Sequence, residues 1–218
     1  MKTITITGIG KLSVKPDLIV ISMQLDTENK EYDQAMLSAS EKINALNKSL
    51  EELGFSKDAL KTTNFNVRTI YENIKDETGR YKNVFKGYSC IHNLKLEFDF
   101  DTKQLSKVLS RISNCIAKPE LSILFTIKDK TKINEELLKS ASFNALEKAK
   151  ILCLASNVKL GNLISINYSW GELNVHSDTN YKVEARCMMK AESCLSNIDI
   201  EPEDIDITDS ATFVWEII

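Results

Sequence analysis

The first 25 residues consist of two alternating runs of apolar and polar side chains, joined by a link that contains glycine. Ile4 and Ile6 share one face of the first run, and the apolar face of the second run holds Ile19, Ile21, Met23 and Leu25. A period of two residues is typical of strands with one buried face. Between the runs, Gly8 and Gly10 predict a bend or bulge, and Pro16-Asp17 stands ahead of the second strand, where a missing N–H costs least.

The location of the protein is predicted from these same residues and from its cysteines. The first strand begins at residue 3, which leaves no room for an export signal before the folded domain. The five cysteines are an odd number and form no CxxC pair. We therefore expect reduced thiols in a cytoplasmic protein.

Composition excludes several classes of partner. A chain of 218 residues with 43% hydrophobic and 27% charged residues is long and apolar enough for one large globular domain or two small ones. The 28 basic and 31 acidic residues are spread along the chain, so no basic stripe indicates nucleic acid. The longest apolar runs have the length of a strand, which predicts no membrane span.

Three segments have the spacing of helices. The first, about 36–53, carries a narrow apolar stripe that is too short for a coiled coil, so we expect it to pack on a sheet, and Gly54 is placed to end it. The second, about 102–116, follows a capping residue at Asp101 or Thr102. The third, about 131–157, has a face of small residues that predicts close packing on a sheet, namely Ala141, Ala145 and Ala149.

Further strands are expected at about 62–71, 88–100, 121–127, 164–170 and 205–217, whereas 171–197 follows neither period and predicts a long loop or extension. The order is β-β-α-β-β-α-β-α-β-β. It predicts an α+β fold with mixed, largely antiparallel sheets and helices packed on the sheet faces. We expect a single domain over residues 1–218, with two lobes as an alternative, one of about 1–94 plus 196–218 and the other of about 95–195.

A set of small motifs runs through nearly the whole chain in a fixed order. It comprises Gly8, Gly10, Pro16, Asp17, Gly54, Gly87, Ala145, Lys148, Ala149 and Gly161. In this order and spacing the sequence resembles the SIMPL-domain family, a bacterial group also called a domain of unknown function. The resemblance implies an α+β fold and, for some members, self-assembly into larger oligomers. It brings no agreed catalytic residues, and some members are labelled oxidative-stress defence or periplasmic immunogenic proteins.

This sequence departs from the family pattern in two places. Many relatives carry a secretory signal that is not seen here. The link after the second helix, 114–119, lacks the usual glycine.

Few residues are suited to catalysis. His92 lies on an apolar strand face, where a buried histidine with a satisfied ring is expected, and His176 is expected in a solvated loop. Cys90 shares the face of His92, but positions i and i+2 of a strand lie about 7 Å apart, too far for a direct thiolate–imidazole pair. Gly8-x-Gly10 lacks the remaining parts of a phosphate-binding loop. We therefore predict no enzyme activity, no cofactor and no metal.

One late cluster offers a candidate site in the segment without a clear period: Cys187, Met188, Met189 and Cys194. Soft sulfur donors suit Cu(I) or Zn, but the spacing fits no standard zinc site, and paired methionines also suit a partner-binding surface. We expect a non-catalytic protein linked to stress response, which forms a homo-oligomer or binds a protein partner. The alternative is a thiol-based oxidative-stress protein that uses the exposed cysteines Cys187 or Cys194.

Overall fold

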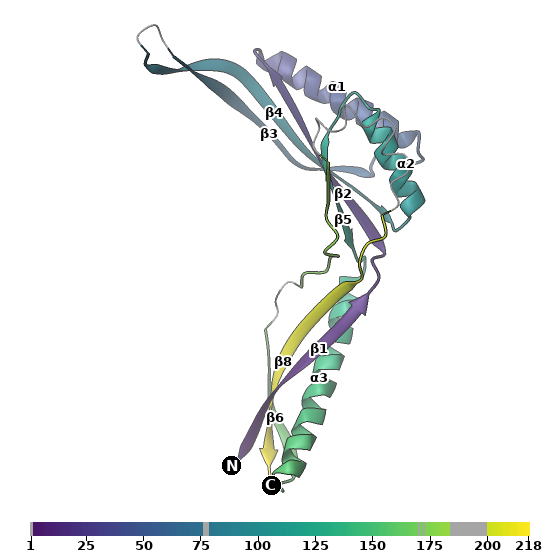
Figure 1. Ribbon diagram of the computed structural model, residues 1–218, viewed down its shortest axis with the longest axis vertical. Helices are drawn as coiled ribbons and strands as arrows, with labels where there is room; N and C mark the ends of the chain where they lie inside the picture. Colours follow the sequence, from purple (N-terminus) through teal and green to yellow (C-terminus); the bar gives the residue numbers. More distant parts are fainter. Residues whose placement is uncertain (1, 76–78, 170, 172, 184–199) are drawn as a thin grey trace. The chain divides into compact units, whose positions relative to one another are not determined.

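The computed structural model describes residues 2–75, 79–169, 171, 173–183 and 200–218. Within these residues, three helices and eight strands follow one another along the chain (Figure 1). They are β1 (Thr3–Val14), β2 (Leu18–Asn29), α1 (Tyr32–Glu51), β3 (Leu60–Lys75), β4 (Tyr81–Asp99), α2 (Thr102–Ser113), β5 (Glu120–Thr126), α3 (Lys130–Ala155), β6 (Leu160–Tyr168), β7 (Tyr181–Val183) and β8 (Ile205–Ile217). The α+β class and the predicted order are confirmed, and β7 is a short strand within the segment that was expected to be a loop.

The chain forms two compact units. One comprises Met1–Asp17, Thr126–Asp178 and Pro202–Ile218, and contains a sheet of order β1-β8-β6 with α3. The other comprises Leu18–Phe125 and Thr179–Glu201, and contains a sheet of order β3-β4-β2-β5-β7 with α1 and α2. The single-domain organisation and the lobes expected from the sequence stay predictions.

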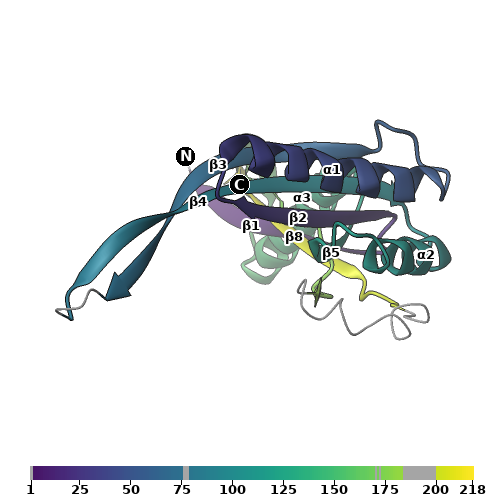
Figure 2. The ribbon, with the colours of Figure 1, turned by 90° about the horizontal axis from the view of Figure 1, so that it is seen from above.

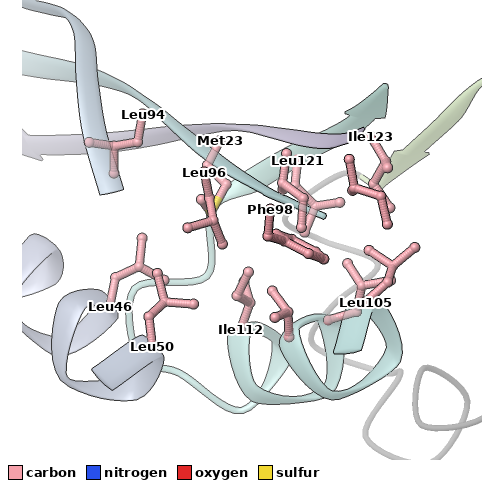
Figure 3. Close-up of a cluster of buried hydrophobic side chains, with 14 of the residues drawn as sticks. Met23, Leu46, Leu50, Leu94, Leu96, Phe98, Leu105, Ile112, Leu121 and Ile123 are labelled. Atoms are coloured by element: carbon pink, nitrogen blue, oxygen red, sulfur yellow. The ribbon is translucent and has the colours of Figure 1, made fainter. Parts of the chain in front are cut away.

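In the larger unit, α1 and α2 pack on one face of the five-stranded sheet. Figure 3 shows their apolar side chains directed toward those of the strands, with Leu46 and Leu50 from α1 and Ile112 from α2. All three are at most 2% exposed, and full burial of such a side chain stabilises the fold by about 1.5–3 kcal/mol. The carboxylate of Asp101 accepts hydrogen bonds from the first backbone N–H groups of α2, as an N-cap should. The apolar stripe of α1 therefore serves sheet packing, as predicted.

In the smaller unit, α3 lies along β1 and β8. The bend or bulge predicted at Gly8 and Gly10 of β1 is wrong. Strand β1 pairs with β8 in an unbroken register from Thr3 to Val14, so Gly8 and Gly10 form neither a bend nor a bulge. A Cβ atom at Gly8 or at Gly10 would lie within 3.0 Å of a backbone carbonyl of α3. The missing side chains thus let the helix approach the strand. The three alanines predicted to allow such packing are fully buried, which confirms that part of the prediction.

The other family motif residues take structural positions. The carboxylate of Asp17, which follows Pro16, accepts a hydrogen bond of 2.8 Å from the backbone N–H of Lys128. Lys148 donates to the carbonyl of Thr7 at 3.2 Å, which ties α3 to β1, where Ala145 and Ala149 also pack. Gly54 has a φ of +92° just after α1, a conformation that favours glycine. Gly161 lies within β6, which begins at Leu160, and α3 ends before it, at Ala155.

Candidate interaction surface

The hairpin of β3 and β4 continues past the last pairing of β2, which joins Asn29 to Tyr88. From there to the tip the two strands pair only with each other, as residues 70–75 and 81–87, and we call this part the arm. Figures 1 and 2 show the arm projecting beyond the end of α1. The arm was missed in the sequence, where the return strand was expected to open at Gly87-Tyr88 rather than at Tyr81.

A bulge sets the arm off from the rest of the sheet. The register of β3 with β4 shifts between Ile70 and Tyr71, because β4 has one extra residue, Lys86, between Phe85 and Gly87. Gly87 has a φ of +152°, and a Cβ atom there would lie within 3.0 Å of the backbone of Asn29. Only glycine therefore fits easily at the base of the arm.

Both faces of the arm carry exposed apolar side chains. The register places Tyr71, Phe85 and Tyr81 on one face, and Tyr71 and Tyr81 are 58% and 70% exposed. The opposite face exposes Ile74 and Val84. Large apolar groups on both sides of a two-stranded ribbon cannot belong to the core of this unit, so they form a candidate contact surface.

The aromatic rings of the arm continue into the base of the sheet. The ring of Tyr71 lies edge-on to that of Phe85 with centroids 5.9 Å apart, and Phe85 lies 5.4 Å from Tyr88. Tyr88 in turn contacts Tyr32 at the start of α1, at 5.5 Å. Near the tip, the ammonium of Lys75 lies 5.3 Å from the centre of the Tyr81 ring, a cation–π geometry. These contacts hold rigid, amphipathic side chains in fixed positions on the surface.

His92 and Cys90 lie near the base of the arm, and each has a different partner. The ring nitrogen Nε2 of buried His92 lies 2.8 Å from the hydroxyl of Thr62, which confirms the expected satisfied histidine. Cys90 is buried, with its sulfur 3.9 Å from that of Met36. Burial, and next the charge of Asp26, raise the pKa of the Cys90 thiol, so the sulfur is held in its unreactive protonated form.

Stability should fall in mild acid because of His92. Burial lowers the pKa of its imidazole below the usual value of about 6.5. As the pH falls through that value, the unfolded chain takes up a proton that the folded chain does not, so the free energy of unfolding decreases until the lowered pKa is reached. We expect urea unfolding to show a smaller stability at pH 5 than at pH 7. His92→Gln should reduce this difference, and an unchanged difference would contradict the assignment.

The late cluster of the sequence analysis, Cys187, Met188, Met189 and Cys194, lies outside the described residues. Its redox, metal and interaction readings stay predictions. The cysteines within the described residues, Cys90, Cys115 and Cys153, are free and buried. In the same part of the chain, no group of three or more His, Cys, Asp or Glu side chains is placed to hold a metal ion. His176, expected in a solvated loop, forms an isolated backbone bridge with Thr126.

None of the helices in the described part of the chain combines the length and the apolar character needed to cross a membrane.

Comparison with known proteins identifies relatives of this chain. The SIMPL family, described as a protein of unknown function (DUF541), matches residues 4–215. Two proteins named 26 kDa periplasmic immunogenic protein are similar, from Brucella melitensis at 23% identity and from Brucella abortus at 22%. Each match covers 75% of this chain and 65% of the relative's length. None of these names denotes an enzyme.

The names of the relatives contradict one prediction. Both are called periplasmic, which points to an exported protein, so the expected cytoplasmic location is wrong. The inference from the first residues of the sequence fails for this reason, and with it the expectation of thiols kept reduced by a cytoplasm.

Proposed function

The chain belongs to the SIMPL family over residues 4–215, and from this premise we propose that it is an exported, non-catalytic protein that self-associates through its arm. The arm, residues 70–75 and 81–87, is the part of the larger unit best suited to this role. The proposal rests chiefly on one observation, the apolar side chains exposed on both of its faces.

The energetics of the arm favour a bound state. A two-stranded ribbon on its own is marginally stable in water, because neither face is covered. Tyr71, Tyr81 and Phe85 are already partly covered, so their complete burial against another surface would contribute about 1–2 kcal/mol for each ring. Association would therefore stabilise the arm as well as join the partners.

A second copy of this chain is the occupant that fits best. Strand β3 lies at the end of the sheet order, so its outer edge offers unpaired backbone groups along the arm. Two such edges can pair antiparallel about a twofold axis, which brings the same aromatic side chains of both copies together. The arm carries acidic Glu72 and basic Lys75, Lys82 and Lys86, and Lys86 pairs with Glu28 of β2, so self-pairing brings charges of both signs together.

The proposal is tested by the mass of the protein in solution, measured by size-exclusion chromatography with light scattering over a range of concentrations. A reducing agent is included so that no disulfide joins the chains. At the highest concentrations we expect a species of at least twice 24.6 kDa. A mass of 24.6 kDa at every concentration would refute self-association.

A further inference from the structure

The face of the five-stranded sheet opposite α1 and α2 contains a cavity of about 440 Å³. In β2 and β4 the side chains of Met23 and Leu94 point toward the helices, and those of their neighbours point the other way. The polar side chains that line the cavity come from five strands, β2, β3, β4, β5 and β7, and are Ser22, Gln24, Thr63, Asn93, Glu120, Ser122 and Lys182. The volume is that of a small-molecule site.

Asn93, which lines the cavity, carries a buried acceptor without a donor. The side-chain oxygen Oδ1 of Asn93 is buried and makes no hydrogen bond within the described structure. A buried polar atom left unsatisfied costs about 1–3 kcal/mol, so this oxygen favours a ligand that brings an N–H or O–H group. The hydroxyl of Thr63, which also lines the cavity, donates at 3.2 Å to the backbone oxygen of Asn93 and leaves Oδ1 free.

Charges of both signs lie on the same wall. Lys182 in β7 is directly opposite Ser122 in β5, and Glu120 lies two residues before Ser122 on the same face. Glu120 and Lys182 are thus diagonal neighbours across the two strands, about 7 Å apart. The side chain of neither residue forms a hydrogen bond or an ion pair with another described residue. Within the described part of the chain, both charges are therefore available to a ligand.

We propose that this cavity binds a free amino acid or a similar small zwitterion. The ammonium group of the ligand would donate to Oδ1 of Asn93 and to the carboxylate of Glu120. Its carboxylate would accept from the ammonium of Lys182 and from the hydroxyl of Ser122. The proposal does not depend on self-association, because the cavity lies on the sheet face and not in the arm.

The composition of the wall favours a zwitterion over a sugar. Sugar sites commonly offer an aromatic ring on which the apolar face of the sugar stacks, and the described lining residues include none. A simple anion would form an ion pair with Lys182, but it would bring no hydrogen-bond donor for Oδ1 of Asn93. It would also be repelled by the carboxylate of Glu120. Only a ligand with a donor and a negative charge complements all three groups.

Isothermal titration calorimetry of the full chain with each common L-amino acid tests the proposal. At least one should bind, and its N-acetyl and amide derivatives should bind about tenfold more weakly or worse, because each loses one charge. Lys182→Gln and Asn93→Ser should each weaken binding by about tenfold. Lys95→Gln is the matched control, since Lys95 lies on the same sheet face, pairs with Glu97 and does not line the cavity.

Three results would overturn the proposal. These are no binding by any amino acid, equal binding of the capped derivatives, or binding that Lys182→Gln leaves unchanged. Because Asn93→Ser alters a central strand, its fold is checked by thermal unfolding. Lys182→Gln, in the short β7 at the end of the sheet, carries the test if Asn93→Ser is unstable.

Discussion

Gly8→Ala is expected to lower the free energy of unfolding by about 3 kcal/mol, at the upper end of the usual cost of overpacking. The new methyl group would lie within 3.0 Å of the carbonyl of Ala141 and of the side chain of Ala145. The obstacle includes helix backbone, so no rotation of a side chain relieves the clash, and α3 would have to move away from β1. Equilibrium unfolding in urea measures the loss.

Gly171→Ala provides the control for this substitution. No atom of the described residues lies within 4 Å of a Cβ atom at Gly171, and the φ of Gly171 is not in the left-handed region. The stability of the variant should therefore stay within about 0.5 kcal/mol of that of the parent. Gly10→Ala should behave like Gly8→Ala, because its Cβ would meet the backbone of Leu137. If Gly8→Ala were as stable as Gly171→Ala, this would contradict the claim that α3 lies too close to β1 to admit a methyl group at position 8.

The double substitution Tyr71→Ser and Phe85→Ser is expected to abolish self-association. Both rings are exposed and lie on one face of the arm, so their removal takes away apolar area that only a bound partner would cover. If each partly exposed ring contributes about 1–2 kcal/mol to association, the double variant weakens it by about thirtyfold or more. Light scattering should show a mass of 24.6 kDa under conditions in which the parent is assembled.

Phe143→Ser is the matched control for the arm variant. Phe143 is 67% exposed on α3, so the substitution removes a comparable exposed ring from the smaller unit. This variant should assemble like the parent. An arm variant that assembles as well as the parent, or a Phe143→Ser variant that becomes monomeric, would mean that the arm is not the contact surface.

The sequence predicts elements well where one periodicity runs without a break. The alternation in β2 and the alanine face of α3 identify both elements and the faces that they bury. Gly8 and Gly10 were misread because a glycine in a strand indicates a bend or a close approach equally well. Only the position of α3 over β1 distinguishes the two.

The arm escaped prediction because of its bulge. Tyr81, Asn83 and Phe85 alternate in the same way as Tyr88, Cys90 and His92, but the extra residue at the bulge shifts the phase by one. A single period of two residues in the sequence therefore predicts that the strand begins after the bulge, at residue 88. Strand β7 is missed for a simpler reason, since three residues are too few to show any period.

The candidate surfaces are less predictable than the fold. In the sequence, the sulfur residues at 187–194 suggest a candidate site by their chemistry, whereas the arm is a candidate surface because common aromatic side chains are exposed there. The polar cavity combines residues from five strands, among them Gln24 and Asn93, which face each other only through the pairing of β2 with β4. No local motif marks such a site, because the chemistry arises from the sheet register.

Photo-crosslinking from the arm tests the central claim most directly. A photoreactive benzoylphenylalanine replaces Phe85, which is exposed in the arm, and the purified protein is irradiated in reducing buffer. The account predicts a product of twice 24.6 kDa whose crosslinked peptides join position 85 of one copy to the arm of another. Crosslinks confined to a single chain, or joined to surfaces outside the arm, would contradict self-association through the arm.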